Sequence, residues 1–434
     1  MGVAVVLDRS DARSYDERRL FFLRHVEEGT SVPVFPIRLE SKDDLSRMIR
    51  SIGADPRSDA FFRPKAGLLF FFVPDADFRA AAFIKQELLS RGGDAVVNRG
   101  VINATAERSD VLLFGNEGQI DSLIRKLDFL HCWGLDEIRS ALERARKGAA
   151  TRRWTLPLPG RRFLELGDTP VIMGIMNLTP DSFHPESRVS GERAAERAAE
   201  MLTQGAAIID IGAESTRPGS EPVSAKEELD RLLPALRAVR NALPGAILSV
   251  DTYKGDVARA AIRCGADIIN DISGFGLDPD ILDAVAESEV PYILSHIRGT
   301  PKDMQQNPHY DHLLHEMLVS FDEKLDILAK KGVLQDRILL DPGIGFGKRL
   351  EDNLGILRQI DAFTCFGRPL CVGHSRKGFI ARSLQSDAPE DRTAGTQAVT
   401  AYCAMRGVSI LRVHDIRENA ATIAMIGKIR EASL

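Results

Sequence analysis

Residues 338–348 read Ile338-Leu-Leu-Asp-Pro-Gly-Ile-Gly-Phe-Gly-Lys348, a short aliphatic run that ends in an aspartate and a glycine-containing loop. An aliphatic run without polar alternation predicts a strand that is buried on both faces, as in a parallel sheet. Similar runs lie on either side of it in the chain. The eight predicted strands are 171–175, 207–211, 247–250, 267–269, 292–294, 338–340, 370–372 and 409–413.

Amphipathic helical patterns separate these strands, most clearly over 192–204 and 226–243. Glycines follow several of the patterns, where the end of a helix favours a left-handed residue. Eight strand–helix units over about 260 residues match a (β/α)₈, or TIM, barrel. A doubly wound open sheet is the alternative architecture.

The N-terminal part of the chain has a different pattern. Short apolar runs at 32–37, 67–73, 94–97 and 111–114 alternate with helical patterns at 78–89 and 119–130. This alternation predicts a small additional α/β domain over residues 1–150, whose role the sequence does not reveal. Residues 151–162 are basic, contain proline and glycine, and show no sustained period, so we expect a linker there. The barrel domain then covers residues 163–434.

Composition limits the classes of partner. The net charge of −5 argues against a nucleic-acid or anionic-membrane partner, because no overall positive field attracts either one. The longest apolar run, 66–73, is far shorter than the roughly 20 residues that span a bilayer. Five scattered cysteines without a paired motif indicate reduced thiols. We therefore expect a cytoplasmic protein.

Polar residues follow the predicted strands at their C-terminal ends, where TIM barrels build their active sites. They include Asn177, Glu214, Asp251, Asn270, His296, Asp341, Ser375 and Arg412. Any single one of them is explained equally well as a turn residue or a helix cap. Eight such positions on one rim predict an active site.

Two carboxylates and an amide on this rim indicate the shape of a ligand. Asp251, Asp341 and Asn270 suit a flat heterocycle whose amino-amidine edge presents parallel N–H donors. Lys377 adds a donor for a ring carbonyl or nitrogen.

Basic residues on the same rim indicate an anion. Arg217, Arg412 and His414 form an expected cationic cluster that suits a phosphate or pyrophosphate. A heterocycle pocket beside a pyrophosphate pocket implies cleavage of a carbon–oxygen bond with pyrophosphate as the leaving group.

Five motifs in this order resemble the dihydropteroate synthase family of pterin-binding TIM barrels, over about residues 171–434. They are Asn177-Leu-Thr-Pro-Asp-Ser-Phe183, Glu214-Ser-Thr-Arg-Pro-Gly219, the 341–348 loop, Ser375-Arg-Lys377 and Arg412-Val-His-Asp415. The resemblance implies a transferase of folate biosynthesis. Such an enzyme condenses 6-hydroxymethyl-7,8-dihydropterin pyrophosphate with p-aminobenzoate to give 7,8-dihydropteroate and pyrophosphate. Pyrophosphate departs first, and the amine then captures the cationic pterin methylene.

The resemblance also implies the roles of individual residues. Asp251, Asn270, Asp341 and Lys377 would hold the pterin. Asn177, Thr216, Arg217, Arg412 and His414 would hold pyrophosphate, with Asn177 near Mg²⁺, the expected cofactor. Phe183, Pro218, Phe346 and Gly378 would line the p-aminobenzoate side. Asp251, Lys377, Arg217 and Arg412 would take part in catalysis.

Two departures from the family pattern lie on the amine side of the site. Pro185 stands where the family has an acidic residue, and Gly378 stands where it often has serine. The amine is therefore p-aminobenzoate or an analogue.

Two other functions, and the oligomeric state, stay open at this point. A pterin-dependent methyltransferase would need no pyrophosphate cluster. A non-catalytic pterin-binding module would not need both the heterocycle site and the pyrophosphate site. A homodimer is one oligomeric state that the sequence leaves open.

Overall fold

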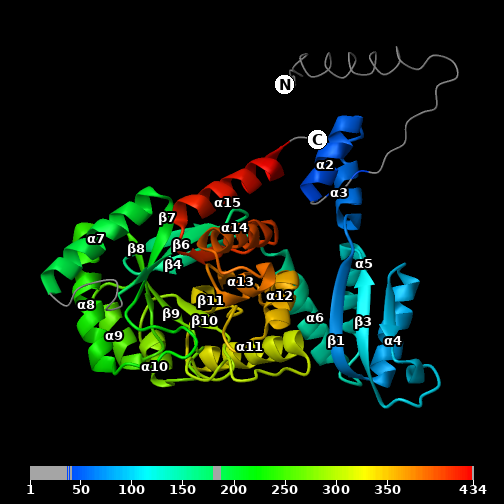
Figure 1. The fold of residues 1–434 in the computed structure, drawn as a ribbon. Helices are drawn as coiled ribbons and strands as arrows, with labels where there is room; N and C mark the ends of the chain where they lie inside the picture. The colour runs from blue at the N-terminus through cyan, green and yellow to red at the C-terminus, as the bar shows by residue number, and fades with distance from the viewer. Residues whose placement is uncertain (1–36, 38, 40–41, 179–186, 433–434) are drawn as a thin grey trace, which may run out of the picture.

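The computed structural model describes residues 37, 39, 42–178 and 187–432, without the side chains of 187–190 (Figure 1). A small N-terminal α/β unit lies beside a larger barrel (Figure 1). Within these described residues, no helix is both long and apolar enough to cross a membrane.

Eight parallel strands form the barrel. They are β6 Val171–Asn177, β7 Ala206–Gly212, β8 Ile247–Asp251, β9 Ile268–Asp271, β10 Tyr292–Ser295, β11 Ile338–Asp341, β12 Cys371–Gly373 and β13 Ile410–Val413. Their order is β11-β10-β9-β8-β7-β6-β13-β12, and a parallel bridge between Leu340 and Leu370 joins the two ends. The predicted TIM barrel is confirmed, and the ring excludes the open sheet.

Helices surround the strands on the outside (Figure 1). They are α7 Ser187–Thr203, α8 Ala225–Ala242, α9 Gly255–Arg263, α10 Asp280–Ala286, α11 Leu313–Lys330, α12 Leu350–Arg358, α13 Gly378–Leu384, α14 Pro389–Met405 and α15 Ile416–Glu431. Two short 3₁₀ segments, η3 Gln335–Arg337 and η4 Ile360–Phe366, precede β11 and β12. The largest hydrophobic cluster contains residues of both strands and helices, among them Ile209, Leu248 and Leu236. Burial of these aliphatic faces stabilises the ring.

A β-hairpin closes the N-terminal end of the barrel. Strands β4 Trp154–Leu158 and β5 Arg162–Leu166 pair antiparallel. Buried Leu156, Leu158 and Leu166 join one cluster with strand residues Met173 and Ile293. The expected linker at 151–162 therefore differs from the structure, which places most of it inside the barrel domain. The apolar alternation here is short and interrupted by prolines, so its period was too weak to reveal a strand.

The N-terminal unit is a three-stranded antiparallel sheet with helices. It contains α2 Lys42–Ile52, α3 Ser58–Phe62, η1 Arg63–Lys65, β1 Leu69–Asp77, α4 Phe78–Ser90, β2 Asp94–Val97, η2 Arg99–Val101, β3 Arg108–Gly115, α5 Glu117–Leu127 and α6 Leu135–Ala150. The order is β1-β3-β2. The runs expected at 67–73, 94–97 and 111–114 are strands, whereas most of 32–37 lies outside the described residues.

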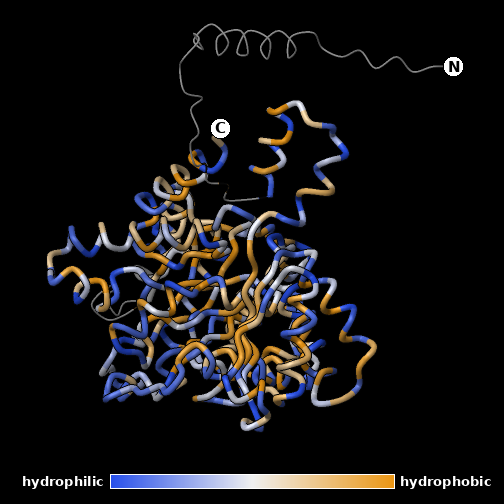
Figure 2. Tube along the Cα trace, turned by 90° about the vertical axis from the view of Figure 1, so that its right-hand side faces the viewer, coloured by the Kyte–Doolittle hydropathy of each residue, from blue (hydrophilic) through white to orange (hydrophobic). Residues whose placement is uncertain are grey.

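One face of this sheet carries the core of the N-terminal unit. Ile84 of α4 and Leu123 of α5 are fully buried in one cluster with Val111 and Leu113 of β3. The opposite face leaves Phe70 exposed. The strands of this unit form a hydrophobic band in Figure 2, which is turned by 90° from Figure 1.

Helix α6 connects the two parts. Gly148 lies against the backbone of η4, where any Cβ would collide with the carbonyl of Cys365. Four residues after α6, the Trp154 indole donates a hydrogen bond to the Gly367 carbonyl at 2.9 Å. The N-terminal unit is therefore anchored on the outside of the barrel, away from the C-terminal strand ends.

Candidate active site

The predicted polar residues converge at the C-terminal ends of the barrel strands. Asp251 ends β8, Asn270 lies in β9 and Asp341 ends β11. All three are buried, at 8%, 3% and 8% exposure. A buried carboxylate loses its hydration, so each one requires a charged or hydrogen-bonding partner.

An arginine in the barrel interior supplies one such partner. The Arg412 guanidinium on β13 lies 2.5 Å from Asp210 through Nε and 2.6 Å from Asp251 through Nη2. Asn270 Nδ2 also donates to Asp210, at 3.2 Å. Burial alone would lower the pKa of Arg412, but the two carboxylates raise it above its ordinary value. Arg412 was expected to face pyrophosphate, whereas here it is paired within a four-residue network.

Asp210 is a site residue that the sequence reasoning missed. It lies inside the aliphatic strand β7 and is fully buried. A carboxylate within a buried strand was the available signal, because such a residue is almost never buried without a partner. Among the described residues, Asp210 Oδ1 and Asp251 Oδ1 have no hydrogen-bond partner. The pocket therefore offers two buried acceptors to the N–H donors of a ligand.

A second acid–base pair lies at the ends of β11 and β12. Burial raises the pKa of Asp341, while Lys377 and the Gly343 N–H, which donates to Asp341 Oδ1 at 2.7 Å, oppose the rise. Burial lowers the pKa of Lys377 to about 8, against the effect of Asp341. The Lys377 ammonium donates to the Ile344 carbonyl and lies 4.2 Å from the Phe346 ring centroid. The two charges therefore lie at one end of the pocket, with an aromatic ring beside them.

The 343–347 loop is packed tightly enough to hold this pair in place. Gly343 and Gly347 have φ values of +67° and +64°, and a Cβ on either would collide with the backbone of His296 or Arg298. Fully buried Lys348 donates to the carbonyls of His296 and Phe346, each at 3.0 Å. Gly343 and Gly347 are thus required by close backbone approach.

His414 differs electrostatically from the expected cationic cluster. Its Nδ1 lies 3.1 Å from Ser375 Oγ, and burial together with Arg412 and Arg376 lowers its pKa to about 4. The ring is therefore neutral at pH 7 and would bind an anion by hydrogen bonding rather than by charge. Arg217 is exposed and lies close enough to lower the pKa of His414 as well.

Asn177 joins the same rim from β6. A side chain at Gly212 would begin 3.4 Å from the Cβ of Asp251 and 3.8 Å from Asn177 Oδ1, so both flank this glycine. Among the residues that the structure describes, no group of three or more His, Cys, Asp or Glu side chains could hold a metal ion.

Only some of the residues expected on the p-aminobenzoate side lie in the described part of the chain. Thr216 is half-buried and Pro218 exposed in the loop between β7 and α8. Gly378 is the first residue of α13, and a Cβ there would meet nothing within 4 Å. Phe183 and Pro185 lie outside the described residues.

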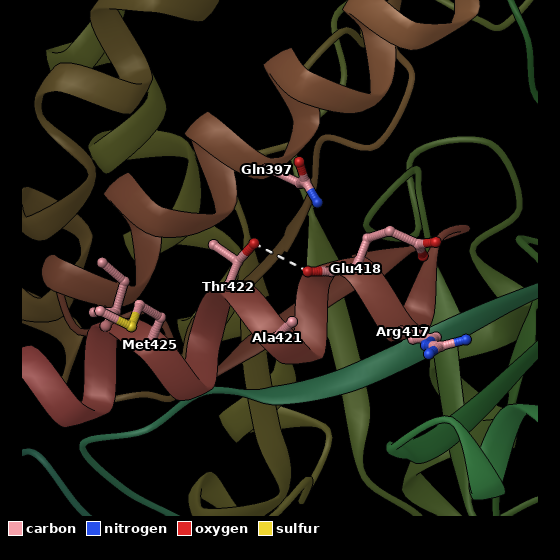
Figure 3. Close-up of a pocket in the computed structure, with 7 residues that line it drawn as sticks. Gln397, Arg417, Glu418, Ala421, Thr422 and Met425 are labelled. Carbon is pink, nitrogen blue, oxygen red and sulfur yellow. Dashed lines mark hydrogen bonds between the residues drawn. The ribbon is translucent and has the colours of Figure 1, made fainter.

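A cavity of about 600 Å³ lies elsewhere, against α14 and α15 on the outside of the barrel (Figure 3). Gln397, Arg417 and Met425 are among its lining residues. Thr422 Oγ1 is already bonded to the Glu418 carbonyl at 3.0 Å. None of the predicted site residues lines it.

Comparisons with known proteins agree with the chemistry of the rim. The family model described as pterin binding enzyme matches residues 173–414. A dihydropteroate synthase of Synechocystis is 43% identical over 278 residues, covering 64% of this chain and 94% of that protein. A solved Xanthomonas albilineans dihydropteroate synthase with 4-aminobenzoic acid is 36% identical, with a TM-score of 0.59, covering 65% of this chain and all of that one.

One relative extends beyond the barrel. A bifunctional dihydropteroate synthase/dihydropteroate reductase of Helicobacter pylori is 35% identical over 391 residues. The match covers 90% of this chain and 97% of that protein, so it includes much of the N-terminal unit.

Proposed function

The chain belongs to the pterin-binding enzyme family, and we propose on that basis that it acts as a dihydropteroate synthase. It condenses 6-hydroxymethyl-7,8-dihydropterin pyrophosphate with p-aminobenzoate. The bond between the pterin methylene carbon and the pyrophosphate oxygen breaks, and a bond to the amine nitrogen forms with loss of one amine proton. The observation that carries this proposal is the cluster of buried Asp210, Asp251 and Asp341 at the strand ends, with Lys377 beside it.

Acceptors in the barrel interior would bind the pterin. The unpaired Oδ1 atoms of Asp210 and Asp251 can accept the parallel N–H donors of an amino-amidine edge. Lys377 can donate to a ring oxygen or nitrogen, with Asp341 beside it. When pyrophosphate departs, the pterin methylene becomes cationic, and buried carboxylates stabilise that charge at low local polarity.

The opposite part of the rim would bind pyrophosphate. Asn177, Thr216 and neutral His414 offer hydrogen-bonding groups, and exposed Arg217 offers a positive charge. Arg412 would contribute its positive charge to this part of the rim without binding pyrophosphate alone, since its guanidinium is shared between two carboxylates. The Asn177 side-chain oxygen also fits Mg²⁺, which commonly takes one or two protein oxygens and completes its shell with phosphate oxygens and water. Bound Mg²⁺ would neutralise the charge of the leaving group.

The amine would enter beside Pro218, Phe346 and Gly378. The backbone N–H of Gly378 at the start of α13 is available for a carboxylate, since the first N–H groups of a helix have no partner within the helix. This supports p-aminobenzoate, whose carboxylate lies at the end opposite its amine.

Pyrophosphate release tests the reaction class. We expect release when the protein, Mg²⁺ and dihydropterin pyrophosphate are mixed with p-aminobenzoate, and a marked fall when the amine is omitted or when EDTA removes the metal ion. A methyltransferase or a non-catalytic pterin-binding module would release none under any of these conditions. Pyrophosphate release that continues without Mg²⁺ would overturn the assignment of Mg²⁺ as cofactor but not the proposed reaction.

We also propose a homodimer and a cytoplasmic location. Met425 and Ile429 of α15 are 60% and 59% exposed, and Met425 borders the groove of Figure 3, so a second copy could cover this apolar surface. All five cysteines are unpaired, as expected in a reducing compartment. Sedimentation equilibrium of the wild-type protein and of Met425→Glu measures the oligomeric state; a monomeric wild type would contradict the dimer.

A second activity, reduction of dihydropteroate, is favoured by the Helicobacter pylori relative, because that match extends over the N-terminal unit. Hydride carriers such as NAD(P)H or a flavin would supply the electrons. The test is oxidation of NADPH that depends on dihydropteroate, with and without added flavin. Oxidation at the rate of a protein-free control in both cases would remove this second function.

A further inference from the structure

A buried three-residue charge cluster lies next to the candidate active site. The Lys254 ammonium follows β8 and contacts the carboxylate of Glu214, which follows β7. It also lies 2.6 Å from the carboxylate of Glu228, in the first turn of α8. The side chains of Lys254, Glu214 and Glu228 are 13%, 6% and 1% exposed. One lysine therefore joins three segments of the chain.

Glu214 joins the two ends of the loop 214–223, which it begins. Its Oε1 accepts hydrogen bonds from the Val223 N–H at 3.2 Å and from the Tyr253 hydroxyl at 3.0 Å. Val223 lies at the other end of the loop, so one carboxylate holds both ends together. Ser220 Oγ adds a second tie, to the Ser215 carbonyl at 2.6 Å. The loop 214–223 is thus closed at its base, while Arg217 at its tip is exposed.

The buried Glu214 that joins the ends of this loop depends on the positive charge of Lys254. Burial alone would lower the pKa of Lys254, but Glu214 and Glu228 raise it above its ordinary value, so the ammonium persists at pH 7. Burial raises the pKa of Glu228, and Lys254 opposes that rise. Without Lys254, two buried carboxylates would face each other with no positive partner, an arrangement that is strongly unfavourable.

We propose that Lys254 is a positioning residue that, through Glu214, fixes the loop 214–223 and so presents Thr216 and Arg217 to the reacting groups. This inference rests on the proposed function, because it assigns a consequence for turnover. Lys254 touches neither the unpaired acceptors of Asp210 and Asp251 nor Asp341. Its loss should therefore affect the pyrophosphate and amine sides while the pterin ring still binds.

Hydrogen exchange of the loop amides measures the positioning directly. We expect Lys254→Met to speed exchange over 214–223 about tenfold, as local opening becomes easier. Lys254→Arg keeps the charge and should restore most of the protection. Glu214→Gln keeps the acceptor for Val223 but loses the ion pair, and should lie between the two.

Arg240→Met is the matched control. Arg240 lies on the same helix α8 and pairs with buried Asp267 at 2.7 Å, at the N-terminal end of the barrel strands. This variant should lower stability without changing exchange in the loop 214–223. Equal exchange in wild type and Lys254→Met, or a comparable increase in Arg240→Met, would overturn the proposal.

Kinetics provide the second readout. Lys254→Met should raise the KM for the amine about tenfold, as expected when hydrogen bonds to charged groups are lost. The Kd for a dihydropterin without pyrophosphate should stay within about twofold in calorimetry, because that ring does not depend on the loop. If wild type does not turn over, the proposed function fails. If wild type turns over and Lys254→Met matches it in KM, the positioning role fails.

Discussion

Arg412 Nε lies 2.5 Å from Asp210 Oδ2 inside the barrel, and the same guanidinium lies 2.6 Å from Asp251. Two carboxylates therefore share one arginine, and each keeps an oxygen to which no described residue donates a hydrogen bond. Burial raises the pKa of Asp251 to about 7 against the effect of Arg412, while one oxygen of each acid stays available as an acceptor. Such a pocket favours a ligand that gains positive charge during reaction.

Asp210→Asn tests the importance of this pairing. The amide cannot replace the carboxylate as a charged partner, so Arg412 should turn away and pterin affinity should fall at least about tenfold, since hydrogen bonds to charged groups contribute roughly 1.5–3 kcal/mol. Calorimetry with a dihydropterin measures the affinity. Asp361→Asn, which affects an exposed pair with Arg406, is the control. Unchanged affinity in Asp210→Asn would show that Asp210 only fills the core.

Asp341→Ala should abolish measurable pterin binding. The side chain is buried, and its loss would remove the carboxylate that most favours the charged form of Lys377. Asp341→Asn keeps the shape and should retain weak binding. A folded Asp341→Ala protein that binds a dihydropterin as tightly as wild type does would contradict the pterin assignment.

Gly378→Ser should strengthen the binding of p-aminobenzoate. Position 378 begins α13, has open space around a Cβ, and lacks a left-handed backbone that would strain serine. The added hydroxyl could donate to the carboxylate of the amine, a bond worth about 1.5–3 kcal/mol at best. The KM for p-aminobenzoate is the readout, with Gly378→Ala as the control. A KM that is flat or higher in the serine variant would mean that the amine is held differently.

The barrel and most of its rim could be predicted from the sequence. Strands buried on both faces give unbroken aliphatic runs, and polar residues at their ends fall on one side because all the strands are parallel. Asp251, Asn270 and Asp341 were predicted at the strand ends in this way, and the structure joins Asp251 and Asn270 in one network through Asp210 and Arg412.

Other features depend on three-dimensional context. The 154–166 hairpin is short and contains prolines, so its burial becomes visible only against the barrel floor. Asp210 was not predicted as a site residue because it lies within an aliphatic run that indicates only a buried strand. The neutrality of His414 arises mainly from burial, which the sequence pattern does not show, and from Arg412 and Arg376, the second of which comes from another loop.

Stability should fall in mild acid because of His374. This residue is fully buried, bonds to Thr400 Oγ1 at 2.8 Å, and burial lowers its pKa from 6.5 to about 4. Between these values the unfolded chain binds a proton that the folded protein does not. The stabilisation is therefore complete above about pH 6.5 and is lost as the pH falls towards 4, by about 3 kcal/mol at most.

Urea unfolding at several pH values measures this effect. His374→Gln removes one titrating group and should reduce the slope between pH 4 and 6.5, to which His296 and His414 also contribute because burial lowers the pKa of each. A slope that is the same in both proteins would mean that His374 is protonated in the folded state.

The central claim is that this pocket joins a pterin to an arylamine. The most direct measurement is mass spectrometry of the product formed from dihydropterin pyrophosphate and isotopically labelled p-aminobenzoate, with wild type and Asp341→Asn run in parallel. We predict labelled 7,8-dihydropteroate, in equal amount to the pyrophosphate released, with wild type and far less with the variant. Pterin bound without any labelled product, or a product whose yield is the same in both proteins, would contradict the account.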